Sequence, residues 1–343
     1  MEASSGPAAP LLAGKLPAPL LAEILAGLPA PPTDVLLGPR VGEDACAVEV
    51  PRSVLVAATD PITFTAQEIG RFSVIVNAND VAVMGVRPRW FLAVILLPPG
   101  SSERTLRVVF ASMQEELSSI GATLVGGHTE VTPAVAQPVI VGEFLGIAED
   151  GRFVRSDGMR AGDVLIQVGP APIEGAAVLA REAADRLIGL DPAVLGEARG
   201  ALHRPGISVV EPALLAGELG ATAMHDPTEG GLAGGLRELS EASGVRIRVD
   251  LSSVLWFAPG RAVCEALAAD PMSTLASGAL LASFPADRAR AAVQALARGG
   301  HVVSEIGRAE EGSGVWDSEG RRLPWPERDE AARVLAARRD PRG

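Results

Sequence analysis

The sequence has only two cysteines among 343 residues, Cys46 and Cys264, and they lie far apart. No CxxC pair and no cluster of cysteine and histidine occurs, so we do not expect a disulfide framework. We expect the protein in a reducing compartment. No apolar run approaches the roughly 20 residues that span a bilayer, and the first residues do not follow the pattern of a signal peptide. The sequence predicts a cytoplasmic protein without a membrane partner.

Positive charge is also scarce. The 30 basic residues are outnumbered by 42 acidic ones, which gives a net charge of −12. This balance argues against non-specific binding to nucleic acid or to an anionic membrane. No P-loop motif occurs, and no GxGxxG motif follows an expected strand. A hydrophobic fraction of 48% is enough for a sizeable core, and the length suits two domains.

Helical and strand patterns alternate along the chain, which predicts an α/β or α+β class. We expect helices at 16–28, 68–85, 101–121, 174–189, 208–220 and 287–300. We expect strands at 45–50, 54–60, 90–97, 122–127, 139–148, 163–169 and 245–251. A polar, turn-rich stretch at 149–163 places a domain boundary near residue 160.

The positions of several acidic residues point to a shared site. Asp44 lies in a turn before a strand, and Asp60 ends an apolar strand. Asp80 lies in the middle of an apolar helix, with Asn77 one turn earlier on the same face. A carboxylate there is costly to bury unless it is paired or holds a metal, and Mg²⁺ prefers oxygen ligands. These acids predict a Mg–nucleotide site, and the alternative is that each one caps a turn or meets an arginine.

Glycines are concentrated at the start of one expected helix, in "AMHDPTEGGLAGGLRELSEASG" (223–244). The four glycines are Gly230, Gly231, Gly234 and Gly235. Each costs a helix interior about 0.5–1 kcal/mol relative to alanine. Thr228 can cap this helix and Asp226 can hold the turn. Two explanations stay open: access of a phosphate to free backbone amides, or close packing of the helix on a strand.

Five segments in this order resemble one family: "VGEDACAV", "ATDPITF", "NANDVAVMGVRPRWF", "GGHTEVTP" and "HDPTEGGLAGGL". They are similar to the aminoimidazole ribonucleotide (AIR) synthetase superfamily. Its members include the hydrogenase maturation factor HypE, selenophosphate synthetase and thiamine-monophosphate kinase. The resemblance runs from about residue 35 to 310, and "HDPTEGGLA" looks most like HypE and AIR-synthetase-related proteins.

The resemblance implies a two-domain PurM-like fold. Its N-terminal domain (35–159) would bind ATP and pair with a second copy to build a β-barrel homodimer. Its C-terminal domain (160–312) would be an α/β sandwich. An N-terminal arm and helix (1–34) and a C-terminal tail (313–343) would flank them.

The resemblance also implies a set of site residues for ATP and Mg²⁺. The metal carboxylates would be Asp44, Asp60 and Asp80, with Asn77 beside them. The nucleotide-facing positions would be Gly126, Gly127, Thr129, Asp226, Thr228, Gly230 and Gly231. The catalytic candidates are Asp44, Asp80 and His225, and His225 can equally be a packing histidine. His128 stands where several members carry an acid.

The implied function is an ATP-dependent enzyme of the ligase or phosphotransferase type. It would activate or phosphorylate an oxygen of a small molecule, either a carbonyl or amide oxygen or a phosphate oxygen. HypE modifies a cysteine at its own C-terminus, and no cysteine follows Cys264 here. We therefore do not expect that self-modification. The alternative is an accessory protein that binds ATP and docks a hydrogenase maturation partner without chemistry of its own.

Overall fold

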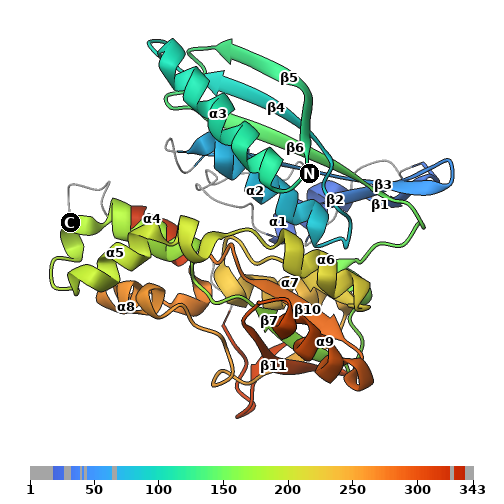
Figure 1. The fold of residues 1–343 in the computed structure, drawn as a ribbon. Coiled ribbons are helices and arrows are strands. Elements are labelled where there is room, and N and C mark those ends of the chain that lie inside the picture. Colours follow the sequence, from blue (N-terminus) through green and yellow to red (C-terminus); the bar gives the residue numbers. More distant parts are fainter. Residues whose placement is uncertain are drawn as a thin grey trace, which may run out of the picture.

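The computed structural model describes residues 18–26, 32–38, 41, 45–63, 68–324 and 328–336. They form two six-stranded sheets, one from each half of the chain, with helices packed on both (Figure 1). None of the helices in these ranges is both long and apolar enough to cross a membrane.

The first sheet is built by the N-terminal half. Its strands are β1 (Val35–Leu37), β2 (Ala45–Val50), β3 (Ser53–Ile62), β4 (Trp90–Leu97), β5 (Thr123–Val131) and β6 (Val139–Ala148). Their order across the sheet is β1-β2-β3-β6-β4-β5. Helices α2 (Ile69–Ala82) and α3 (Glu103–Ser119) cover one face, and α1 (Ala18–Ala26) precedes the sheet in sequence.

This sheet is open, with β1 and β5 at its edges, so no closed barrel forms within the described chain. The predicted barrel needs a second copy and stays a prediction.

The apolar residues of β4 alternate between the two faces of the sheet. Phe91, Ala93 and Ile95 point to the helix-covered face and are buried. The other side of β4 carries Leu92 and Leu96, which are half-buried, and Val94, which is 37% exposed. The continuous apolar run predicts burial on both faces, and one chain covers only one of them.

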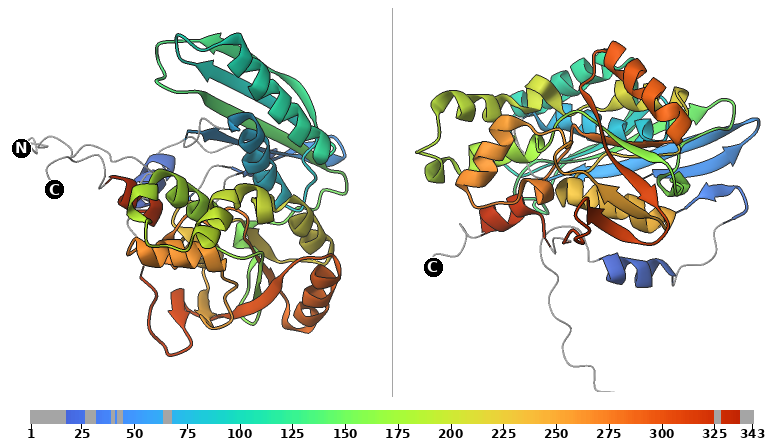
Figure 2. Two further views of the ribbon diagram at one scale, coloured as in Figure 1. Left: turned by 60° about the vertical axis from the view of Figure 1, so that its left-hand side comes forward. Right: turned by 90° about the horizontal axis from the view of Figure 1, so that it is seen from below.

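The second sheet has both faces covered, which agrees with the predicted α/β sandwich. Its order is β12 (Gly314–Asp317), β9 (Arg246–Val249), β11 (Val303–Glu310), β7 (Val164–Val168), β10 (Leu280–Phe284) and β8 (Ala223–His225). Helices α6 (Val210–Glu218) and α9 (Ala286–Arg298) pack on one face, and α7 (Gly231–Ser243) packs on the other. The right-hand view in Figure 2 shows α9 and α7 on opposite sides of the strands.

Four further helices form a separate layer beside the second sheet. They are α4 (Glu174–Glu182), α5 (Pro192–Gly200), α8 (Ala258–Ala266) and α10 (Glu330–Ala336). Their apolar side chains share one buried cluster, which includes Leu179, Val263, Cys264 and Val334. Cys264 is therefore a small buried hydrophobe here, and burial raises the pKa of its thiol to about 11.

Several expected elements are found as predicted, and others differ. The strand at 90–97 and the helix at 68–85 correspond to β4 and α2. The single helix expected at 174–189 is wrong: α4 ends at Glu182 and a short 3₁₀ turn follows at 184–186. Helices α5 and α8 are additional, since neither was expected from the apolar pattern.

The two halves are joined by a buried amide. The side chain of Asn79, on α2, donates from Nδ2 to the carbonyl of Ile207 at 2.9 Å. Its Oδ1 accepts the backbone N–H of Val209, also at 2.9 Å. Asn79 is only 1% exposed. Both of its hydrogen bonds reach residues of the second half, so this side chain fixes how α2 meets the segment before α6.

Replacing Asn79 with alanine should lower the free energy of unfolding by about 2–4 kcal/mol, because it leaves a buried N–H and a buried carbonyl without their partner. Urea denaturation measures this change. Gln114→Ala is the matched control, since Gln114 is exposed and bonds only within its own helix. Equal stability of the two variants would contradict this account of the junction.

Candidate functional site

A cavity of about 300 Å³ lies between the two halves. Its walls come from β3 and α2 in the first half, and from α4 and the turn before α7 in the second. The polar lining residues are Asp60, Thr63, Glu174, Arg181, Glu182, Thr228, Glu229 and Ser277. The apolar lining residues are Pro61, Ile62, Phe72, Val76, Val178, Leu202 and Leu275. The cavity brings together two of the predicted site residues, Asp60 and Thr228, which are 168 positions apart in sequence.

Asn77 holds the backbone of Asp60 in place. The buried Asn77 side chain accepts the N–H of Asp60 at 2.7 Å and donates to its carbonyl at 3.2 Å. The same amide also donates to the carbonyl of Ser73 at 2.9 Å. Asn77 therefore ties the end of β3 to α2, and the side chain of Asp60 remains on the wall of the cavity.

Asp80 lies one turn beyond Asn77 on α2 and is 5% exposed, and it does not line the cavity. Asp44, the third predicted metal ligand, lies outside the described residues. Within the described ranges, no group of three or more acidic, histidine or cysteine side chains is placed to hold a metal ion. A metal site built wholly from these described carboxylates is therefore not formed.

The glycine-rich turn meets a carboxylate of the same chain. Gly230 is the N-cap of α7, with a left-handed φ of 84°. Its N–H donates to Oδ2 of Asp329 at 2.9 Å, and Oδ1 of Asp329 accepts the N–H of Ala331 at 2.8 Å. The amide predicted to face a phosphate thus holds an anion that the C-terminal segment supplies.

Two of the other glycines are required by close packing. A Cβ on Gly231 would lie 2.5 Å from the carbonyl oxygen of Met272, and one on Gly235 would lie 2.8 Å from the Cβ of Pro227. Backbone and ring atoms at these distances leave no room for a side chain. Close packing of α7, one of the two explanations kept open, therefore accounts for these two positions.

Three acids gather around this turn. Burial is the largest cause that raises the pKa of Glu174, to about 7, and the negative charges of Asp329 and Glu229 raise it further. Burial also raises the pKa of Asp329 to about 6, although the amides of Gly230 and Ala331 act in the opposite direction. The cavity end beside α7 is therefore rich in carboxyl groups, which favour a cation or a metal-bound anion over a bare phosphate.

Sequence reasoning missed Glu174 and Asp329. Each belongs to a segment far from the motifs, and Asp329 reaches Gly230 across 99 positions. One sequence feature could have indicated Glu174. In "IEGAAVLARE" (173–182) it stands directly before a glycine at the start of a helix rich in small residues, as Glu229 stands before Gly230.

His225 and Asp226 are both buried, at 4% and 3% exposed. His225 lies on β8, and its Nε2 is 2.5 Å from Oε2 of Glu238 on α7. It therefore ties the strand to the helix and lies outside the residues that line the cavity. His128 is exposed on β5, where its Nε2 is 3.2 Å from Oε2 of Glu130.

The "GGHT" turn lies elsewhere. Gly126, Gly127, His128 and Thr129 belong to β5 and line a separate hollow of about 220 Å³ with Ala93 and Phe110. Strand β5 is the exposed edge of the first sheet. A single chain therefore does not bring these predicted positions to the cavity between the halves.

Two family models match the chain. The model of the AIR synthase related protein N-terminal domain matches residues 42–148, and that of the C-terminal domain matches residues 160–316. The chain belongs to the AIR synthase related family. It is 30% identical over 282 residues to a protein named carbamoyl dehydratase HypE from Rhizobium leguminosarum bv. viciae, with 78% of each chain covered.

Two other members of the AIR synthase related family illustrate its range. A selenide, water dikinase from Nitratidesulfovibrio vulgaris (strain DP4) is 30% identical over 244 residues, which cover 68% of this chain and 66% of that one. A crystal structure of the hydrogenase maturation protein HypE in complex with ATP is 25% identical, with a TM-score of 0.68. That match covers 84% of this chain and 89% of the HypE chain.

The raised pKa of Glu174 gives this family member a testable pH dependence. The folded protein holds this proton up to about pH 7, whereas the unfolded chain releases it near pH 4.5. The stabilising contribution is therefore full below about pH 4.5 and is lost as the pH rises through about 7. Relative to Glu174→Gln, the wild type should lose on the order of 3 kcal/mol of unfolding free energy between these limits.

Denaturant unfolding from pH 5 to pH 8 measures this loss. Glu265→Gln is the control, because Glu265 is an exposed glutamate on α8. The assignment is wrong if the Glu174→Gln and Glu265→Gln variants follow the same pH profile.

Proposed function

We propose that this chain is an ATP-dependent enzyme that transfers the γ-phosphoryl group to an oxygen of a small molecule. The observation that carries the proposal is the interdomain cavity, which Asp60 from the first half and Thr228 and Glu229 from the second half line together with apolar side chains. A cavity of about 300 Å³ with a few convergent polar groups suits a small-molecule ligand.

The apolar part of the lining suits the base of a nucleotide. Phe72 and Val76 of α2 face Leu202 and Leu275 of the second half, so both halves contribute to that wall. A ligand that occupies this wall would contact both halves at once. Binding would then depend on the junction that Asn79 fixes.

The acids in the wall suit a triphosphate that enters as its magnesium complex. Mg²⁺ usually binds one or two protein carboxylates together with phosphate oxygens and water. Asp60 would supply one carboxylate, with Asp44 and Asp80 as the other proposed ligands. When bound, the metal would neutralise charge on the transferring phosphoryl group.

The chain's own residues would mainly position the reactants. Thr228 offers a hydroxyl at the turn, and Arg181 is the one cation in the described cavity lining. The Arg181 guanidinium donates to the carbonyl of Arg199 at 2.7 Å, which ties its side chain to α5. In phosphoryl transfer, such positioning and charge stabilisation supply most of the catalysis.

The relatives support this class of reaction. One similar protein is named a dikinase, another is named a carbamoyl dehydratase, and a HypE structure is described as an ATP complex. We assign the ligase or phosphotransferase type on that basis. Because the HypE structure is described as that of a hydrogenase maturation protein, an ATP-binding accessory protein with a maturation protein as its partner is the competing assignment.

Asp60→Asn should weaken Mg-ATP binding about tenfold or more, because it removes a carboxylate facing the proposed metal. Calorimetric titration with a non-hydrolysable ATP analogue measures binding, and phosphate release measures turnover. Asp150→Asn is the control, since Asp150 lies in an exposed turn after β6 and pairs with Arg152. The proposal is ruled out if the wild type does not bind Mg-ATP, or if Asp60→Asn and Asp150→Asn bind it equally well. Tight binding without turnover across a metabolite panel would favour the accessory protein.

We also propose a homodimer through the open face of the first sheet. Leu92, Val94 and Leu96 on β4 form an apolar row that no described helix covers. Val125 is 54% exposed on the neighbouring edge strand β5. A second copy of the same face would bury this apolar row.

Val94→Asp should convert the dimer to a monomer, because it places a charge in the middle of this face. Light scattering coupled to gel filtration measures the mass. Val302→Asp is the matched control, because Val302 is 60% exposed on the second half. If the wild type is a monomer, or if both variants keep the dimer, the proposed interface is wrong.

A further inference from the structure

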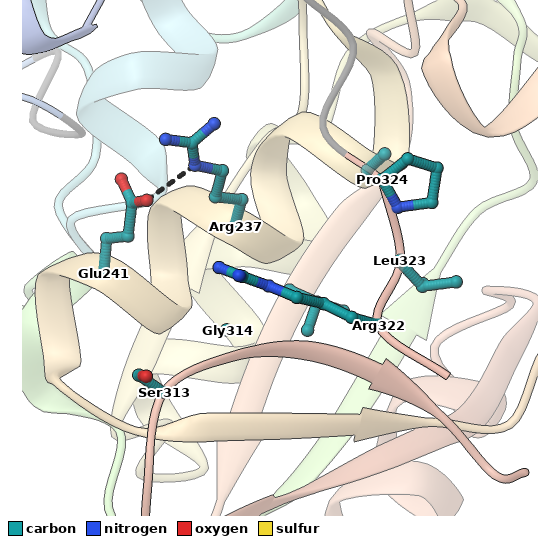
Figure 3. A pocket seen from close by; sticks show the side chains of 9 residues that line it. Arg237, Glu241, Ser313, Gly314, Arg322, Leu323 and Pro324 are labelled. Carbon is teal, nitrogen blue, oxygen red and sulfur yellow. Dashed lines mark hydrogen bonds and ion pairs between the residues drawn. The ribbon is translucent and has the colours of Figure 1, made fainter. Parts of the chain in front are cut away.

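A second and larger pocket, of about 530 Å³, lies in the C-terminal half (Figure 3). It is bounded by one side of α7, by the start of β12 and by the segment that follows β12. The lining residues are Ala233, Arg237, Glu241, Ser313, Gly314, Val315, Arg322, Leu323 and Pro324. It shares no lining residue with the cavity between the halves.

Backbone hydrogen bonds fix the walls of this pocket. Oγ of the buried Ser240 accepts the N–H of Gly314 at 3.0 Å and donates to the carbonyl of Val245 at 2.6 Å, which ties β12 to the end of α7. The N–H of Leu323 donates to the carbonyl of Val315 at 2.9 Å, which holds the third wall against β12. The pocket is therefore formed before any ligand arrives.

The pocket holds more positive than negative charge. Figure 3 shows the side chain of Arg322 running across the pocket, with its guanidinium towards α7. Within the ranges that the structure describes, this guanidinium forms no ion pair. The neighbouring Arg237 is 2.6 Å from Oε1 of Glu241, so these two charges offset each other. One positive charge is left in the pocket of a protein whose net charge is −12.

The rest of the lining is mainly apolar. The apolar lining residues are Ala233 of α7, Val315 of β12, and Leu323 and Pro324 of the segment that follows. The hydroxyl of Ser313 lies at the opposite end (Figure 3). A ligand that fits this lining has one charged end and a compact apolar body.

We propose that this pocket binds a small molecule with a single oxyanion group, a phosphate monoester or a carboxylate, on an apolar body. The planar guanidinium of Arg322 matches both oxyanions in geometry and would bind the charged end. The apolar body would lie on Val315, Leu323 and Pro324. This site is separate from the proposed ATP site.

Calorimetric titration with phenyl phosphate and with benzoate tests the proposal. The wild type should bind at least one of the two probes, and the stronger probe identifies the oxyanion. Arg322→Gln should weaken that binding about tenfold or more, since a charged hydrogen-bonded pair is lost. Arg298→Gln, at an exposed arginine that ends α9, should bind like the wild type.

Asp60→Asn should also bind the probe like the wild type, which separates this pocket from the interdomain cavity. The thermal midpoint of Arg322→Gln should match the wild type, because Arg322 is exposed. The proposal is overturned if the wild type binds neither probe, if Arg322→Gln binds as tightly as Arg298→Gln, or if Asp60→Asn abolishes binding. If Asp60→Asn loses ATP binding but still binds the probe, the result concerns the proposed ATP site and leaves the proposal for this pocket intact.

Discussion

The structure depends on one buried helix, α2, and on two amide side chains that it carries. Asn77 holds the end of β3 and Asn79 holds the segment before α6, and both are at most 1% exposed. An amide buried in an apolar helix is tolerated only because both its nitrogen and its oxygen have hydrogen-bond partners. One helix thus fixes the position of Asp60 within the first half and fixes the second half against it. The interdomain cavity follows from these two attachments.

Charge sets the second constraint on the cavity. Glu174, Glu229 and Asp329 surround the turn at Gly230, whose amide already holds the Asp329 carboxylate. A glycine-rich helix start in isolation would attract phosphate. Here the C-terminal segment supplies the anion, and the neighbouring acids favour a cation. The nucleotide proposal therefore depends on a metal ion that binds together with the phosphates. The role of the Gly230 turn is to position the wall of the site.

The sequence allowed the family and much of the core to be predicted, because strong local patterns decide those features. The apolar run at 90–97 is β4, and Asn77 lies one turn before Asp80 on α2 as expected. Helices α5 and α8 were not expected, since each has only 9 residues and gains its stability from a shared cluster. The contact of Asp329 with Gly230 joins segments 99 positions apart, and no local pattern records it. The position of His225 beside Glu238 likewise depends on how α7 packs on β8.

The central claim is that ATP occupies the cavity between the halves. Photolabelling with 8-azido-ATP in the presence of Mg²⁺, followed by mass spectrometry of the labelled peptides, tests it most directly. The account predicts labelling within residues 60–76, 174–182 or 202–207, and loss of the label when unmodified ATP competes. Competed labelling confined to 233–241 or 313–324 would place the nucleotide in the other pocket and would contradict the account.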